Sequence, residues 1–213
     1  MKIIYFLIFT LFVACNTSGQ HTEKITKKEA QLVGGPCEGC EAVFEYKDRS
    51  MNHIDTLPDF FNEGPKLKVS GIIYQPDGKT PAPGVIMYVH HTNQNGIYPK
   101  KGDEKGWGKR HGYIRGWIKT NEKGQYEFYT LIPGAYPDGN NPQHIHPVIL
   151  EPDGKYYYIE DFLFEDDPLL THKRKTRQEK RGGEGNVLSL KKEEKLHIAH
   201  RDIVLGKNVA GYE

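Results

Sequence analysis

The chain has 213 residues, enough for one sizeable domain or one domain with a small appendage. Its 29 basic and 28 acidic residues leave a formal net charge of +1, which gives no electrostatic reason to expect nucleic acid as a partner. The 23 glycines, 13 prolines and 13 tyrosines favour strands and turns over long amphipathic helices.

The first fifteen residues have the features of an export signal. Lys2 provides a positive start, and the apolar run from Ile3 to Val13 is shorter than the ~20 apolar residues that a lasting transmembrane helix needs. Ala14 directly before Cys15 resembles the cleavage box of bacterial lipoproteins. The resemblance implies that Cys15 is lipidated and anchors the protein to the cell envelope, on the periplasmic or the outer-membrane face. The alternative is an ordinary secretory signal, cleaved nearby, that removes Cys15.

A polar stretch and a cysteine pair follow the signal. Residues 16–35 begin with small polar residues and continue with many Lys, Glu and Thr, so we expect a flexible tether before a single domain over 36–213. In an exported protein, Cys37 and Cys40 are expected to be oxidised or metal-bound. The sequence has no second cysteine pair to complete a zinc site, and the neighbouring proline and glycines disfavour the helix that a redox pair usually opens. We expect a structural disulfide rather than a zinc or redox site.

The segments expected to form strands begin at residue 67. Residues 67–73 alternate in the manner of a half-buried strand, and the nearly continuous apolar run over 84–90 indicates burial on both faces. Residues 41–46 are expected to form a short strand or a helical turn. Further strands are expected over 113–120, 125–131, 144–151, 155–163, 187–190 and 196–205. Together these segments predict an all-β fold, an antiparallel sandwich with little helix.

Two longer polar segments lie between the predicted strands. Residues 91–112 form a long irregular connection, and such connections usually carry function or mobility. Residues 172–185 are polar and mostly basic, so we expect a solvated loop there, with a phosphate or membrane-surface patch as the less favoured alternative.

Residues 136–146, with the sequence Y-P-D-G-N-N-P-Q-H-I-H, carry the strongest chemical signal. His144 and His146 are two residues apart, so on a strand both imidazoles point to the same face and can reach one metal ion. The phenol of Tyr136 adds an oxygen donor, and this donor set suits iron, copper or zinc better than calcium or magnesium. The alternative is a surface loop that leads into a strand with two unrelated histidines.

Several segments together resemble the intradiol ring-cleavage dioxygenases, the catechol and protocatechuate enzymes that use non-haem ferric iron. The similar segments are G-V-I-M-Y-V-H-H-T-N-Q-N-G-I-Y (84–98), T-N-E-K-G-Q-Y-E-F-Y-T-L-I-P-G-A-Y-P (120–137), P-Q-H-I-H (142–146), D-F-L-F-E-D-D-P-L (161–169) and R-D-I-V-L-G (201–206). The resemblance covers roughly residues 67–206. It implies a β-sandwich in which Tyr98, Tyr136, His144 and His146 bind Fe(III).

The resemblance also implies a reaction. Tyr136 and His146 would be the axial ligands, with Tyr98, His144 and a hydroxide in the equatorial plane. A catechol would bind as a chelating dianion, and Tyr136 would leave the metal and act as a catalytic proton acceptor. Insertion of O2 between the two oxygen-bearing carbons would then give a muconate-type diacid. The implied partners are a small aromatic diol, O2 and, through the lipid, a membrane; a homo-oligomer is compatible with the sequence.

One position departs from the family pattern. The family usually reads Arg-Pro-Ala-His-Ile-His, and its arginine stabilises charge on the substrate ring, whereas this chain has Asn141 at the arginine position. A preorganised charge of this kind is commonly worth two or more orders of magnitude in rate. Three outcomes are compatible with the loss: a nearby cation (Lys109, Arg110 or Arg115) replaces it, the substrate differs, or the protein binds iron or catechols without efficient turnover.

Other residues are candidates for the surroundings of the metal. Of His90 and His91, we expect one to face inward, as a satisfied core histidine or as a partner of a metal ligand. Trp107 is expected to line an aromatic substrate pocket or to pack the long loop onto the sandwich. His111, in the same loop, is expected to be solvated, with substrate contact as the alternative.

A non-enzymatic function is the rival interpretation. Residues 69–85 and 124–136 also resemble transthyretin-like and carboxypeptidase-regulatory-like sandwiches, which bind carbohydrate or protein partners or act as spacers on surface lipoproteins. Such modules have no reason to carry Tyr98 and the His-Ile-His segment as well, so the dioxygenase interpretation is preferred.

Overall fold

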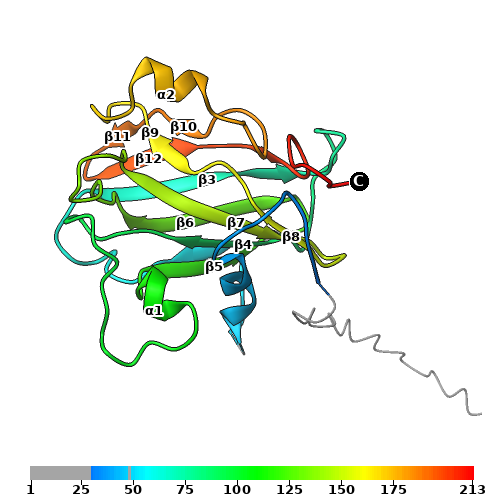
Figure 1. Ribbon diagram of the computed structural model, residues 1–213, viewed down its shortest axis with the longest axis horizontal. Coiled ribbons are helices and arrows are strands. Elements are labelled where there is room, and N and C mark those ends of the chain that lie inside the picture. The colour runs from blue at the N-terminus through cyan, green and yellow to red at the C-terminus, as the bar shows by residue number, and fades with distance from the viewer. Residues whose placement is uncertain (1–29, 48) are drawn as a thin grey trace, which may run out of the picture.

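The computed structural model describes residues 30–47 and 49–213, which form a sandwich of two β-sheets (Figure 1). The all-β fold class predicted from the sequence is confirmed. The export signal, the proposed lipidation site Cys15 and most of the expected tether lie outside the described residues. Within the part that the structure describes, no helix combines the length and the apolar character needed to cross a bilayer.

Each sheet has a five-strand main path. The first runs in the order β1 (Gln31–Leu32), β8 (Lys155–Tyr158), β7 (His144–Leu150), β4 (Ile86–His90) and β5 (Arg115–Lys119), and β9 (Phe162–Phe164) joins it through β7 and also pairs with β10 (Val187–Leu188). The second runs β11 (Lys191–Glu193), β12 (Leu196–His200), β3 (Lys66–Tyr74), β6 (Gln125–Leu131) and β2 (Ile54–Thr56), with β13 (Ile203–Val204) beside β3.

The sheets are mixed, so the prediction of a purely antiparallel sandwich is wrong. The pairs β3–β6, β4–β5, β4–β7 and β7–β8 are antiparallel, but β1–β8, β2–β6, β12–β3, β13–β3 and β9–β10 are parallel. Side-chain periodicity indicates which face of a strand is buried and carries no information about strand direction. The parallel pairs join strands that are not neighbours in a hairpin, so their direction depends on the path of the chain between them.

The first sheet is buried on both faces over β4 and β7, as the apolar run at 84–90 predicts. Met87 and Val89 of β4 enter the main core between the two sheets. Ile86 and Tyr88 point to the opposite face, where they pack in a second cluster with the 3₁₀ helix η1 (Cys40–Tyr46). Successive strand residues alternate between faces, so one strand serves both clusters. The cover provided by η1 makes the outer face of this sheet a place where polar groups can be buried.

The segment before the cysteine pair is part of the fold. We expected a tether through residue 35, but β1 pairs with β8, and Val33 is only 5% exposed. Cys37 and Cys40 form a disulfide at the start of η1. Two short helices, α1 (Gly108–His111) and α2 (His172–Thr176), occupy segments that we expected to be irregular, and α2 lies beside β9 and β10 (Figure 1).

Candidate metal centre

Strand β7 holds both predicted histidine ligands on the outer face of the first sheet. Ile145, between them, is completely buried in the main core, so His144 and His146 point together to the other side. His146 is paired in register with His90 of the neighbouring strand β4. The position of the histidines therefore follows from the alternation that the sequence showed.

The two tyrosines come from loops that are joined to each other. The Thr92 hydroxyl donates to the Gly134 carbonyl at 2.8 Å, and the Gly134 amide donates to the Asn93 carbonyl at 2.9 Å. Gly96 has φ +73°, and a Cβ there would lie 1.9 Å from the Ala135 carbonyl oxygen. This position therefore requires glycine both for its backbone conformation and for the close approach of the second loop. The contacts fix the loop of Tyr98 against the loop of Tyr136.

The four predicted ligands converge on one point. The hydroxyl oxygens of Tyr98 and Tyr136 are 2.7 Å apart, and Tyr136 Oη lies 3.2 Å from His144 Nε2. His146 Nε2 lies 3.0 Å from Tyr98 Oη and 3.5 Å from Tyr136 Oη. Neighbouring ligands at right angles around an ion, with bonds of ~2.1 Å, lie about 3 Å apart. The four separations, from 2.7 to 3.5 Å, are close to that spacing, so these residues could hold one metal ion.

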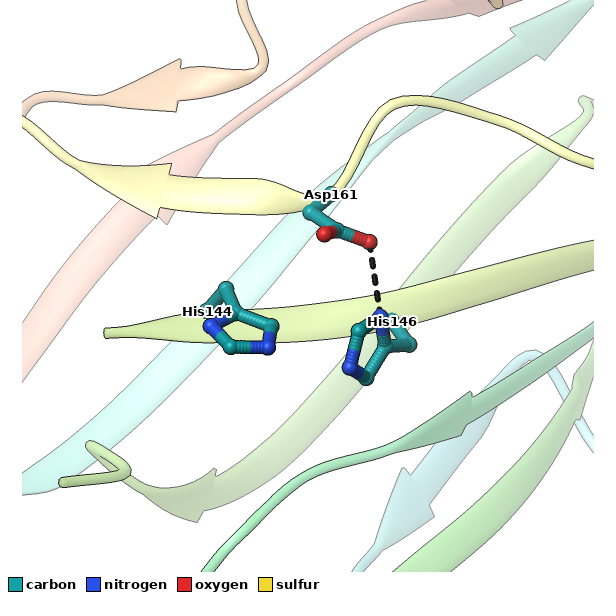
Figure 2. A group of neighbouring side chains, drawn as sticks. All are labelled: His144, His146 and Asp161. Atoms are coloured by element: carbon teal, nitrogen blue, oxygen red, sulfur yellow. Dashed lines mark hydrogen bonds and ion pairs between the residues drawn. The ribbon is translucent and has the colours of Figure 1, made fainter. Parts of the chain in front are cut away.

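A hydrogen bond at Nδ1 orients each of the two imidazoles. His144 Nδ1 lies 2.6 Å from the Pro142 carbonyl, and His146 Nδ1 lies 2.9 Å from Asp161 Oδ1 (Figure 2). A carbonyl and a carboxylate can only accept, so each Nδ1 donates its proton and each Nε2 keeps a free lone pair. Metal-binding histidines are oriented in this way in most proteins. The donor set and its orientation therefore fit a metal ion at the point where the two Nε2 atoms and the two phenol oxygens meet.

Asp161 offers a second possible ligand set, which the sequence did not suggest. One ligand atom from each of His144, His146 and Asp161 falls within 4.8 Å of the others (Figure 2). Two histidines with one carboxylate form a known ligand set for non-haem Fe(II). In this chain, however, Asp161 approaches Nδ1 of His146, on the opposite side of the ring from Nε2. We therefore assign Asp161 the role of orienting His146.

Without a bound cation, burial keeps the phenols of Tyr98 and Tyr136 neutral. Burial and the hydrogen bond with Tyr136 raise the pKa of Tyr98 far above its ordinary value, and burial also raises the pKa of Tyr136. Burial lowers the pKa of His144, so its imidazole is neutral at pH 7. Burial also opposes the charged form of His146, but the adjacent Asp161 carboxylate outweighs burial and leaves the pKa of His146 raised. A bound metal ion would reverse this balance for the phenols, because it stabilises their charge directly.

A stack of aromatic rings supports His146. The ring centroids are 5.4 Å apart for Trp107 and His111, 3.8 Å for His111 and His90, and 4.7 Å for His90 and His146. His111 Nδ1 lies 2.8 Å from the hydroxyl of buried Tyr88, so this histidine is buried rather than solvated as we expected. His90 is buried and its Nδ1 has no hydrogen-bond partner in the described residues. Burial holds the pKa of His90 well below its ordinary value, so the ring packs as a neutral wall.

Two cavities border the cluster and share Tyr136, His146 and Asp161. The first, of about 710 Å³, is also lined by Tyr98, His90 and Trp107. The second, of about 460 Å³, is also lined by His144, Asn141 and the side chains of Arg174 and Arg177. Either volume accommodates a small aromatic molecule beside the metal-binding atoms.

Not all of the predicted surroundings lie at the centre. His91 points away and is a satisfied core histidine, with Nδ1 2.7 Å from the Thr92 carbonyl and Nε2 2.7 Å from the Thr130 hydroxyl. This matches the expectation of a satisfied core histidine, and of the two adjacent histidines it is His90 that lines the first cavity. Trp107 does line the first cavity.

The three cations proposed to replace the missing arginine differ in their positions. Arg115 forms an ion pair with Glu45 at 2.5 Å and borders neither cavity, so its expected position near substrate is wrong. Arg110 and Lys109 both line the first cavity, but Arg110 is paired with Glu38. Arg174 was missed because it lies in a basic run typical of a solvated loop. Only the folded structure shows that this run lines the second cavity.

Comparison with known proteins supports the resemblance seen in the sequence. No protein-family model matches the chain. The chain is 32% identical over 136 residues to catechol 1,2-dioxygenase 1 of Acinetobacter lwoffii, a match that covers 56% of this chain and 42% of that protein. It is 30% identical over 118 residues to the protocatechuate 3,4-dioxygenase beta chain of Burkholderia cepacia, covering 51% of this chain and 48% of that protein. The matches thus span less than half the length of each relative.

Solved structures share the fold. Catechol 1,2-dioxygenase from Acinetobacter sp. ADP1, in a structure inhibited by bound mercury, aligns with a TM-score of 0.55 and 20% identity over 86% of this chain and 62% of that chain. An intradiol ring-cleavage dioxygenase from Tetranychus urticae aligns with a TM-score of 0.54 and 20% identity over 81% of this chain and 90% of that chain. The chain is thus similar in sequence to two intradiol ring-cleavage dioxygenases over about half of its length, and it shares the fold of such enzymes.

Proposed function

We propose that the protein is a non-haem Fe(III) intradiol dioxygenase that cleaves a catechol-type ring with O2 to a muconate-type product. The observation that carries the proposal is the convergence of two phenol oxygens and two Nε2 atoms, each imidazole being held by an acceptor on its Nδ1. Phenolates are hard anionic donors and favour Fe(III), while neutral imidazoles complete the protein ligands. When bound, the iron supplies the chemistry that makes a catecholate reactive toward O2.

The chain itself supplies orientation, a proton acceptor and exclusion of water. Asp161 and the Pro142 carbonyl hold the two imidazoles in the tautomer that leaves Nε2 free. Tyr136 is less buried than Tyr98 and comes from the loop just before β7, so it is the phenol best placed to leave the centre and accept a catechol proton. The stacked, uncharged rings of His90 and His111 form a wall of the first cavity.

Colour and iron content test this proposal. Protein produced in iron-replete medium should contain about one iron per chain and absorb visible light, because tyrosinate bound to Fe(III) is coloured. Tyr98→Phe removes one of the two phenols and should weaken the absorption, and His144→Ala should lower the iron content. Tyr113→Phe is the matched control, because its hydroxyl contacts Asp59 at 2.7 Å outside the cluster and the variant should keep the colour. Oxygen uptake with a series of catechols then measures turnover, and an iron-free, colourless wild-type protein would refute the proposal.

A binding module on a surface lipoprotein is the second candidate. Asn141 favours this candidate, because the family pattern has arginine at that position and the loss of a charge at such a site slows the reaction strongly. A colourless, iron-free protein would support this candidate, whereas a coloured protein that binds catechol anaerobically but consumes no O2 would indicate an iron site without efficient turnover. Export and lipidation at Cys15 stay predictions, and mass spectrometry of the membrane fraction would test them.

A further inference from the structure

Helix α2 and the residue that follows it contribute two arginines to the lining of the second cavity. Arg174 and Arg177 line the cavity of about 460 Å³ together with Tyr136, His144 and Asn141. Arg174 lies in α2, whose N-terminus is capped by the Thr171 hydroxyl at 3.4 Å from the Arg174 amide. The helix is 34 residues away from Asn140 in sequence, yet the Arg174 guanidinium donates to the Asn140 carbonyl. The arginine is therefore attached to the loop that contains position 141.

These two arginines differ from Arg110 and Arg115 in having no acidic partner. Arg110 is paired with Glu38 and Arg115 with Glu45, which neutralises both charges. Among the described residues, neither Arg174 nor Arg177 takes part in an ion pair. A guanidinium that has no carboxylate partner and borders a cavity is available to an anionic ligand there.

We propose that Arg174 supplies the positive charge that residue 141 does not provide, and that it stabilises a catecholate bound at the metal centre. The inference rests on the proposed function. Arg174 is favoured over Arg177 because its side chain is half-buried and its guanidinium is held by the Asn140 carbonyl, whereas Arg177 is exposed. A charge held in place beforehand stabilises an anion more than a mobile one, because less ordering is needed when the anion binds.

Stabilising a bound catecholate requires a positive charge held beside this cavity, and either position 141 or position 174 could supply it. Arg174 contacts the loop through the Asn140 carbonyl and lines the same cavity as Asn141. An arginine at position 141 would therefore border the cavity that Arg174 already lines. The two positions are therefore expected to substitute for each other. This exchange gives a test that a purely structural role of Arg174 would not pass.

The experiment uses full-length, iron-loaded protein and measures catechol binding first, under anaerobic conditions, by the change in the visible spectrum. Arg174→Gln should keep its iron, its colour and its melting temperature, but bind catechol at least tenfold more weakly and lose about 100-fold in kcat/KM. Arg174→Lys should retain part of both. Asn141→Arg in the Arg174→Gln background should recover at least tenfold in binding. Lys173→Gln, on the same helix and exposed, is the control and should behave as wild type.

The outcomes separate this inference from the proposed function. A coloured Arg174→Gln protein that binds catechol as tightly as wild type would overturn the role of Arg174 alone. An equal loss in Lys173→Gln would assign the effect to general surface charge and would also overturn it. A colourless, iron-free wild-type protein would overturn the proposed function, and the inference with it.

Discussion

Replacement of Asp161 tests which atoms bind the metal. In the arrangement that we favour, the Asp161 carboxylate accepts the Nδ1 proton of His146 at 2.9 Å and acts on the metal only through the ring. Loss of such a partner typically costs 10–100-fold in metal affinity, or about 1.4–2.7 kcal/mol. Asp161→Asn keeps an oxygen that can accept the Nδ1 proton, so we expect a loss near tenfold. Asp161→Ala removes the acceptor, and we expect a loss near 100-fold.

The assay is competition for Fe(III) with a chelator of known affinity, followed by the visible tyrosinate band and by total iron. Both Asp161 variants should still be coloured once they are loaded with excess iron, because the two phenols are intact. Tyr98→Phe is the necessary comparison, since it removes a proposed ligand while leaving the contact between Asp161 and His146 in place. If Asp161→Asn bound no metal while Tyr98→Phe bound it as wild type does, the ligands would be His144, His146 and Asp161, and our reasoning would be refuted.

Three further predictions concern stability and the loops around the site. Burial lowers the pKa of His91 to about 4, so between pH 4 and 6.5 the unfolded chain binds this proton more readily than the folded chain does. The free energy of unfolding should therefore rise with pH by roughly 3 kcal/mol over this window. Urea unfolding of His91→Gln should lack this part of the pH dependence. Gly96→Ala should abolish the tyrosinate colour and lower the melting temperature, because its Cβ would collide with the Ala135 carbonyl; an intact spectrum would contradict the close approach of the two tyrosine loops. Cys37→Ser removes the disulfide to Cys40, which closes a loop at a sequence separation of 3. The loss should lower the free energy of unfolding by roughly 2 kcal/mol. An unchanged melting temperature would argue against a structural disulfide.

Much of the strand arrangement could be predicted because burial leaves a periodic record in the sequence. The run over 84–90 indicated a strand buried on both faces, and β4 is buried along its whole length. The segment 125–131 is strand β6 over the same residues. The edge strands β1, β2 and β11 were missed because they have only two or three residues each, too few to show a period.

The continuous strand expected over 155–163 is in fact two strands, and the interruption matters for the site. Residues 159–161 separate β8 from β9, and Asp161 at the end of this break turns its carboxylate to His146. A strand prediction has no means of locating such a break, because the apolar residues on both sides continue the pattern. The partner of His146 could therefore be recognised only in three dimensions.

The sequence alone determined the donors of the proposed metal centre and the family that they resemble, because His-x-His on a strand fixes a shared face and the two tyrosines lie in recognisable loops. The tertiary structure decided which other groups reach that centre. Of the adjacent histidines it is His90, not His91, that faces the cavity, and the guanidinium beside Asn141 belongs to Arg174 rather than to Arg115. Contacts between residues tens of positions apart depend on how the loops and sheets pack, and local periodicity carries no record of that packing.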